Sequence, residues 1–169
     1  MPRANILVVY YSRSGTTETV ARAIAEATGA DVEPLVDTVN RGQVLGFMRS
    51  VRDAASRRQT TLQPLSVDPA DYDLVVVGTP DWGKSVSAPV RTFLAIHAGR
   101  LRQVAFFLTD GEAEHARVFR EMASLVGREP VAQLGIPHDE VDRGTYREQL
   151  VAFLESLPTA HGHVRPAKT

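Results

Sequence analysis

The sequence predicts an α/β fold in which helices cover both faces of a parallel sheet. Apolar, β-branched runs alternate along the chain with segments whose apolar residues recur at the helical period. The two strongest runs, NILVVY and DLVVVG, lack polar alternation, which is typical of strands buried on both faces. A length of 169 residues corresponds to one domain, which we place at residues 1–158.

The first three elements are predicted as strand, helix and strand. Residues 5–10 read NILVVY and form the first strand, and residues 31–36 form a weaker second strand. Between them, residues 16–28 have a helical stripe of apolar side chains and are followed by Gly29, a common stop signal. The side chains expected to face the core are Val20, Ala21, Ile24 and Ala27.

The connection at residues 37–72 is long and contains no predicted strand. Apolar residues at helical spacing predict one helix over residues 41–58, followed by an extended stretch. Its arginines are Arg41, Arg49, Arg52, Arg57 and Arg58. They either form a solvated helix face or attract a phosphate-bearing dinucleotide or an acidic partner.

The second half of the chain continues the alternation. The predicted strands are residues 73–78, 103–108 and 130–136, which brings the sheet to five strands, and the predicted helices are residues 89–97, 112–126 and 142–157. The expected inward side chains of the last two helices are Ala116, Phe119, Ala123, Val126, Tyr146, Leu150, Phe153, Leu154 and Leu157. Residues 159–169 have no periodicity, and we predict a disordered tail.

A loop rich in small hydroxyl residues follows the first predicted strand. Residues 12–17 read SRSGTT and lead directly into the first predicted helix. Free backbone N–H groups and the positive end of the helix dipole bind anions at such a junction. Gly15 allows a close approach of the backbone, and Arg13 can add a charge-assisted contact. The alternative is a helix cap by Thr16 or Thr17, which explains only one or two of these residues.

This loop resembles the phosphate loop of the flavodoxin-like family, whose pattern is Ser/Thr-x-Ser/Thr-Gly-x-Ser/Thr. The resemblance runs from Ile6 to about Leu157. It implies a three-layer sandwich with a five-stranded parallel sheet in the order 2-1-3-4-5. It also implies non-covalently bound FMN beyond the carboxyl ends of the strands, where the order changes between strands 1 and 3. The phosphate would lie on Ser12, Arg13, Ser14, Gly15, Thr16 and Thr17.

A second match to the family follows the third predicted strand. Residues 78–85 read GTPDWGKS, and the family has G-T-P-x-W here; the next helix opens with PVRTFL, which also fits. Trp82, the only tryptophan, can pack on the isoalloxazine ring or simply belong to the core. Lys84 departs from the family pattern and is expected near the pyrimidine edge of the flavin. The cofactor contacts implied by this loop are Thr79, Pro80, Asp81, Trp82, Gly83 and Lys84.

The same residues satisfy the Walker A pattern G-x-x-x-x-G-K-S/T of nucleoside triphosphatases. An ATP site is therefore an alternative. Three features argue against it. Pro89 falls where a P-loop helix should already be running, Pro80 and Trp82 are rigid or bulky where the loop must curl around phosphates, and a phosphate loop already follows the first strand.

The loop after the fourth predicted strand reads TDGEAEH at residues 109–115. In the family this position contacts the flavin ring, and Thr109, Asp110 and Gly111 can supply backbone donors and a turn. Asp110 is also a suitable N-cap for the next helix. We expect His115 to be solvated on the first turn of that helix. The aromatic residue that often shields the outer face of the flavin is missing here, so a binding module that has lost FMN stays open.

Composition excludes several classes of protein. Nineteen basic and 20 acidic residues leave a net charge of −1, which argues against a general nucleic-acid binder. The absence of cysteine excludes disulfides, thiolate nucleophiles and cysteine-ligated metal sites. No apolar run approaches the roughly 20 residues that span a bilayer, and the amino end lacks the layout of a signal peptide, so we expect a cytoplasmic protein.

These observations predict an FMN-binding redox protein. The first interpretation is an NAD(P)H-dependent FMN oxidoreductase that reduces quinones or similar acceptors, and the second is a flavodoxin-type electron carrier between protein partners. The flavin supplies the chemistry in either case, so no side chain is assigned as catalytic. We assign no metal site, because two histidines in the tail, His161 and His163, are too few.

Overall fold

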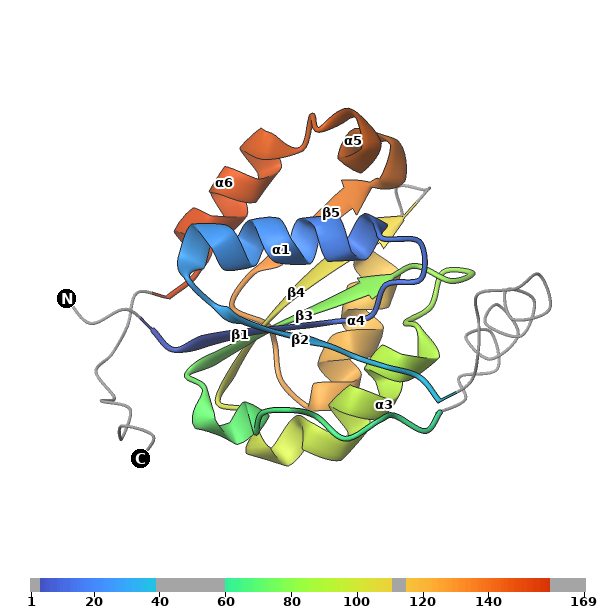
Figure 1. Cartoon of the computed structure of the whole chain (residues 1–169), viewed down its shortest axis with the longest axis vertical. Helices are drawn as coiled ribbons and strands as arrows, with labels where there is room; N and C mark the ends of the chain where they lie inside the picture. The colour runs from blue at the N-terminus through green and yellow to red at the C-terminus, as the bar shows by residue number, and fades with distance from the viewer. Residues whose placement is uncertain (1–3, 39–59, 111–114, 159–169) are drawn as a thin grey trace.

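The computed structural model describes residues 4–38, 60–110 and 115–158. It contains a five-stranded parallel sheet in the order β2-β1-β3-β4-β5, with helices on both faces (Figure 1). The strands are β1 (Ile6–Tyr10), β2 (Asp31–Pro34), β3 (Leu74–Pro80), β4 (Gln103–Asp110) and β5 (Gln133–Pro137). The helices are α1 (Thr16–Thr28), α3 (Ala88–His97), α4 (His115–Val126), α5 (His138–Arg143) and α6 (Arg147–Ser156), with short 3-10 turns η1 (Pro69–Asp71) and η2 (Ala98–Arg100). The predicted fold class and strand order are confirmed.

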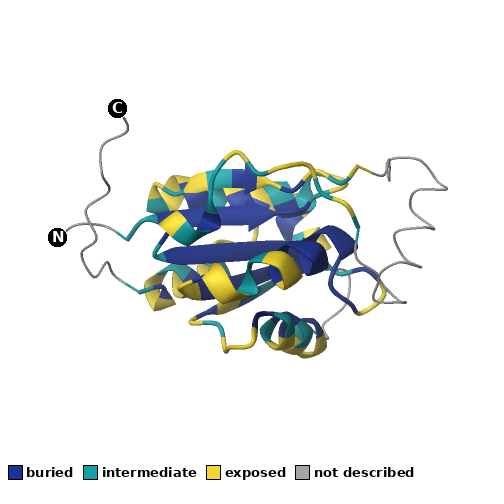
Figure 2. Cartoon of the chain, turned by 90° about the horizontal axis from the view of Figure 1, so that it is seen from below, coloured by how far each residue is buried: buried dark blue, intermediate teal, exposed yellow. Residues whose placement is uncertain are grey.

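The sheet separates two hydrophobic cores. Along β1, Leu7 and Val9 face the side covered by α3 and α4, whereas Val8 and Tyr10 face α1, α5 and α6. This period of two is the geometry of a pleated strand, and both faces are apolar because both are covered. Figure 2 shows the sheet as a buried layer between helices that are exposed only on their outer sides. The continuous apolar runs of the sequence therefore mark central strands.

Parallel pairing brings the carboxyl ends of neighbouring strands to one edge of the sheet. Tyr10 of β1 pairs with Gly78 of β3, and Pro80 of β3 pairs with Thr109 of β4. Beyond the paired ends, the Tyr11 N–H donates to the Gly78 carbonyl at 3.2 Å, and the Asp81 N–H donates to the Thr109 carbonyl at 3.0 Å. The loops after β1, β3 and β4 therefore begin side by side.

The end of the chain differs from the prediction. One helix was expected over residues 142–157, but the structure has α5 and α6 with a break at Gly144. Gly144 has a φ of 68°, the left-handed conformation that closes a helix, and its N–H donates to the Val141 carbonyl. Gly144 is a helix stop signal that the prediction did not use.

Three further details concern the predicted helices. Ala27 and Ala116 are exposed, and their predicted inward positions are taken by Ala25 in α1 and by Val118 and Met122 in α4. The helix predicted at residues 41–58, its arginines and the tail at 159–169 lie outside the described residues. Among the helices that the structure describes, none has the length and apolar character needed to cross a membrane.

Candidate functional site

Helix α1 starts with a glycine in place of a capping side chain. Gly15 is the N-cap residue, with a φ of 96°, and it has no side chain that could accept a hydrogen bond from the first turn. The predicted cap by Thr16 or Thr17 is wrong, because both hydroxyls lie inside the first turn and are bonded elsewhere. The first-turn N–H groups, which lack acceptors within the helix, are therefore left to bind an external anion.

The residues before α1 leave room for that anion. A Cβ atom built on Gly15 meets nothing within 4 Å, so the space beside the helix start is open. The Ser12 hydroxyl accepts the Gly15 N–H at 3.1 Å, which holds the loop in a tight turn. The Ser14 and Thr16 hydroxyl oxygens lie 3.4 Å apart, and Arg13 and Ser14 are exposed. Hydroxyls, amides and a guanidinium beside an open space fit a phosphate group.

A buried hydrogen bond couples this loop to the end of β4. Thr17 Oγ1 and Thr109 Oγ1 are 2.7 Å apart, and both residues are almost completely buried. The contact joins two of the three loops implied by the resemblance. The hydroxyl of Thr17 is thereby committed to the protein, which leaves its backbone N–H for a ligand.

The segment after β3 folds into a tight hairpin. Asp81 and Val86 form an antiparallel bridge, and the Trp82 N–H donates to the Ser85 carbonyl at 3.2 Å. The two residues at the tip, Gly83 and Lys84, both have positive φ, at 65° and 64°, as a type I′ turn requires. This geometry argues against the Walker A alternative, because a P-loop wraps around phosphates and runs straight into its helix, whereas α3 begins only at residue 88.

Trp82 lies inside this hairpin. Its side chain is 6% exposed and contacts Tyr11 edge to face, with ring centroids 5.3 Å apart. It packs with the core that α3 and α4 cover. The indole thus has a structural role, and its contact with a flavin stays a prediction. Trp82 follows the carboxyl end of β3, beside the end of β1, where the flavin is predicted to bind.

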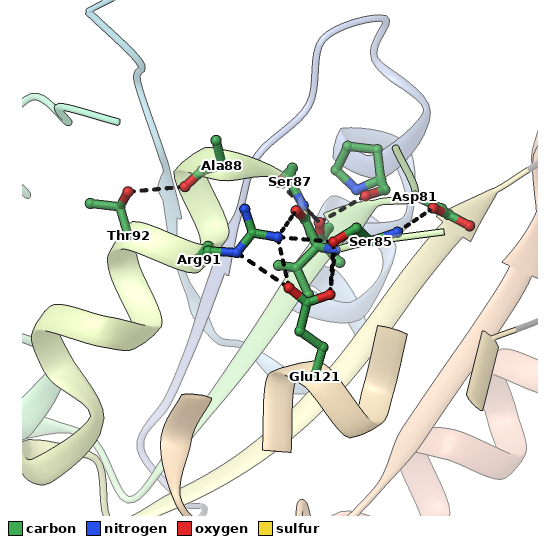
Figure 3. Close-up of polar contacts among 10 residues, drawn as sticks. Asp81, Ser85, Ser87, Ala88, Arg91, Thr92 and Glu121 are labelled. Carbon is green, nitrogen blue, oxygen red and sulfur yellow. Dashed lines mark hydrogen bonds and ion pairs between the residues drawn. The ribbon is translucent and has the colours of Figure 1, made fainter. Parts of the chain in front are cut away.

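A buried ion pair holds the base of the hairpin (Figure 3). Arg91 of α3 donates to Glu121 Oε1 of α4 at 2.7 Å, and the same guanidinium donates to the Ser85 hydroxyl and the Val86 carbonyl. The other carboxylate oxygen of Glu121 accepts the Ser85 hydroxyl at 2.8 Å and the Val86 N–H at 3.2 Å. We call these four residues the hairpin clasp. It fixes the loop after β3 to two helices on the same face of the sheet.

The clasp sets the ionisation of its carboxylate. Burial raises the pKa of Glu121, but hydrogen bonds from Arg91, Ser85 and Val86, together with the Arg91 charge, outweigh burial and hold the pKa below its ordinary value. Glu121 is therefore charged at neutral pH. The side chains of Arg91 and Glu121 are only 4% and 14% exposed, so each charge relies on the other.

Two groups near the site were missed or misjudged from sequence. His138, directly after β5, lies 3.1 Å from the Thr16 hydroxyl through its Nδ1 atom. It was overlooked because its partner is 122 residues away in sequence. His115 was expected to be solvated, but it is half-buried against β5: a Cβ atom on Gly135 would lie 2.0 Å from its ring. A glycine inside a predicted strand was the signal for that close approach.

The clasp was also missed. Arg91 was read only as part of a family pattern, and Glu121 as one residue of an amphipathic helix. A charged residue in the mostly apolar segment 88–94 was the available signal, since charges are almost never buried unless they are paired.

The structure brings most of the predicted site residues to one edge of the sheet. Those at the ends of β1, β3 and β4 are Ser12, Arg13, Ser14, Gly15, Thr16, Thr17, Thr79, Pro80, Asp81, Trp82, Gly83, Lys84 and Thr109. Thr79 is turned inward, where its hydroxyl bonds to Ser87 at 2.9 Å. Asp110 ends β4 opposite Pro137, and Gly111 lies outside the described residues. Among the described residues, no group of three or more His, Cys, Asp or Glu side chains is arranged to hold a metal ion.

Comparison with known proteins gives a family and a set of structural neighbours. A family model described as flavodoxin matches residues 5–129. A flavoprotein from Lactobacillus acidophilus NCFM, solved in complex with FMN, superposes with a TM-score of 0.69 at 21% identity, over 84% of this chain and 99% of the other. A flavoprotein from Bacteroides eggerthii has a TM-score of 0.69 at 19% identity, over 89% and 98%. An apo NADH:FMN oxidoreductase has a TM-score of 0.50 at 14% identity, over 92% and 91%.

Proposed function

Because the chain belongs to the flavodoxin family, we propose that it is an FMN-binding redox protein and, more finely, an NAD(P)H-dependent FMN oxidoreductase. The single observation that carries the FMN site is the start of α1, where an uncapped first turn opens beside Gly15. The L. acidophilus neighbour, which binds FMN, supports the cofactor. Bound FMN would supply the electron or hydride transfer.

The residues of the chain fit each part of that cofactor. We assign the phosphate to the first-turn N–H groups of α1, the hydroxyls of Ser14 and Thr16, and Arg13. The flavin ring would lie between the hairpin at residues 81–86 and the end of β4. The hairpin clasp then acts as a positioning device, because it holds Ser85 and Val86 and so fixes the base of the turn that carries Gly83 and Lys84.

The proposed substrates rest on a structural neighbour. We propose NAD(P)H as the electron donor and a quinone or similar small molecule as the acceptor. The NADH:FMN oxidoreductase among the structural neighbours supports the enzyme. The alternative is a flavodoxin-type carrier that exchanges electrons with protein partners, and the family itself supports it. A carrier needs a separate reductase, whereas an oxidoreductase consumes NAD(P)H unaided.

The test is flavin retention followed by turnover. Purified protein is mixed with FMN and desalted, and its absorbance spectrum is recorded. Retained flavin gives bands at about 370 and 450 nm. NAD(P)H consumption is then followed with a quinone, with and without a helper reductase. Retained FMN with unaided turnover supports the oxidoreductase, and turnover only with a reductase supports the carrier. A protein that retains no FMN overturns the proposed function, and the ATP alternative is then tested directly.

A further inference from the structure

The first residue of α5, His138, lies beside the proposed phosphate site. The Nδ1 atom of His138 lies 3.1 Å from Thr16 Oγ1, and Thr16 is the first residue of α1. The Nε2 atom on the other side of the ring lies 3.4 Å from Asp142 Oδ2, one turn further along α5. A carboxylate beside Nε2 favours a proton there, so the neutral ring presents the lone pair of Nδ1 to Thr16.

This arrangement gives the Thr16 hydroxyl two states. When the imidazole is neutral, the Thr16 hydroxyl donates to Nδ1, and its own proton is unavailable to a ligand. When the imidazole carries a second proton, Nδ1–H donates to Thr16 Oγ1 instead. The hydroxyl proton is then free to turn toward an anion at the start of α1, beside a cation rather than a neutral ring.

We propose that His138 is a positioning residue that couples binding of the FMN phosphate to uptake of one proton. The inference rests on the proposed function, since it assigns the FMN phosphate to the α1 start. Thermodynamic linkage makes this coupling reciprocal: protonation of His138 tightens phosphate binding, and a bound phosphate favours the protonated form of His138. Riboflavin has the same ring system without the phosphate, so its binding lacks this coupling.

Among the described residues, Asp142 is the carboxylate that forms an ion pair with the ring. On α5, Asp139 is paired with Arg143, and Glu140 accepts a hydrogen bond from Gln149 of α6. On α1, Glu18 is paired with Arg22 at 2.7 Å. Arg13, in the loop before α1, is exposed. The His138 side chain is 52% exposed, which gives a proton direct access from solvent.

The experiment compares two ligands across pH. Dissociation constants for FMN and riboflavin are measured by flavin fluorescence between pH 5.5 and 8.5 for the wild type, His138→Gln and Thr16→Val. The quantity compared is the dissociation constant for riboflavin divided by that for FMN. At pH 5.5 we expect this ratio to be about tenfold higher in the wild type than in His138→Gln, which is the effect of one hydrogen bond to a charged group. The excess should be smaller at pH 8.5 than at pH 5.5, because only a doubly protonated imidazole leaves the Thr16 hydroxyl proton free for the phosphate.

Two controls separate the inference from its alternatives. Comparison with His138→Gln at each pH removes the titration of the FMN phosphate itself, which is common to both proteins. Asp139→Asn, on the same helix but paired with Arg143, should match the wild type, whereas Asp142→Asn should change the pH profile. If the wild type and His138→Gln have the same ratio of riboflavin to FMN dissociation constants at every pH, the inference is overturned while FMN binding stands. A wild type that binds neither flavin overturns the proposed function and the inference with it.

Discussion

Arg91 and Glu121 show how a single pair of charges can determine the position of a loop. Each is nearly buried, and each also bonds to Ser85 or Val86 at the base of the hairpin. Removal of one partner leaves the other charge buried without compensation, which is far more costly than loss of a surface pair. The clasp therefore links the stability of the fold to the position of the loop proposed to contact the flavin.

We expect Glu121→Gln to lower the free energy of unfolding at neutral pH by about 3 kcal/mol. Because the folded-state pKa of Glu121 is lowered, the stabilisation is present above the ordinary glutamate pKa and is lost as pH falls through the folded value. The variant should lack that acid-side loss. Urea unfolding at several pH values measures both effects. The control is Glu18→Gln, whose exposed pair with Arg22 should contribute less than about 1 kcal/mol; equal effects would contradict the clasp.

His97, at the end of α3, contrasts with the paired charges of Arg91 and Glu121, because one of its ring nitrogens, Nδ1, is buried without a hydrogen bond in the described part of the chain. Its ring stacks on Phe93, with centroids 4.8 Å apart. Burial, with a smaller contribution from Arg100, lowers the pKa of His97. Protonation of this ring therefore opposes folding.

The sign of that effect predicts a pH dependence. The folded state favours the neutral ring, so this contribution to the free energy of unfolding is complete above the ordinary histidine pKa. It is lost as the pH falls below that value and through the lower pKa of the folded state. We expect His97→Leu to reduce the loss of unfolding free energy between pH 7.5 and 5.5. Denaturant unfolding at the two pH values tests this. A wild type and a variant with the same pH dependence would show that His97 does not contribute.

At the scale of elements, a glycine decides how closely two neighbouring strands of the sheet can pack. A Cβ atom on Gly78 of β3 would lie 1.9 Å from the Phe107 ring of β4. Phe107 is fully buried, so the ring has no space into which it can move. Gly78 pairs with Tyr10 at the edge that carries the candidate site, and a shift there would also move the start of the loop after β1.

Gly78→Ala should therefore destabilise the protein by about 1–3 kcal/mol through overpacking. Gly99→Ala is the matched control, because a Cβ atom there meets nothing within 4 Å. Thermal or urea unfolding of both variants gives the comparison. Equal stability of the two variants would mean that β3 and β4 adjust freely around the added methyl group.

The hairpin turn permits a test of Lys84 that preserves the loop. Lys84 has a φ of 64°, and asparagine is tolerated in that conformation. We expect Lys84→Asn to retain the turn while removing the positive charge, and so to make the flavin midpoint potential more negative, because a nearby cation stabilises the anionic reduced flavin. Redox titration of the FMN-loaded protein measures the shift. An unchanged potential would place Lys84 away from the ring.

At the scale of the whole molecule, the ligand is expected to add to the stability of the fold. A ligand that binds only the native state stabilises it by about 2.7 kcal/mol at one hundred times its dissociation constant. FMN should therefore raise the unfolding temperature. Because the proposed site combines the loops after β1, β3 and β4, loss of any one loop's contacts with FMN should reduce that rise.

Trp82→Ala should weaken FMN binding, and Ser14→Ala combined with Thr16→Ala should weaken it further through lost hydroxyl donors. FMN titration monitored by fluorescence measures both. Thr28→Ala, at the opposite end of α1, is the control and should leave FMN affinity unchanged. Unchanged affinity in both site variants would refute the proposed site. Trp82→Ala also removes a core side chain, so its folding is checked first by circular dichroism.

Local sequence features determined the strands, the three loops and the family. The apolar runs, the SRSGTT loop and the GTPDWGKS segment are each contiguous, so their signals survive without knowledge of the fold. The boundaries of α1 matched the prediction because Gly29 ends it in the left-handed conformation. The break at Gly144 was missed because the predicted helix was started at Asp142, ahead of Tyr146, the first apolar residue assigned to its inward face.

Only the tertiary structure decided which of the predicted contact side chains are bonded or packed within the protein itself. Thr17, Thr79 and Trp82 read from sequence as ligand contacts, yet their side chains are bonded or packed inward. The clasp and the contact between His138 and Thr16 join residues 30 and 122 positions apart. Sequence patterns report local periodicity and spacing, whereas such pairings arise only when parallel strands bring distant loops to one edge of the sheet.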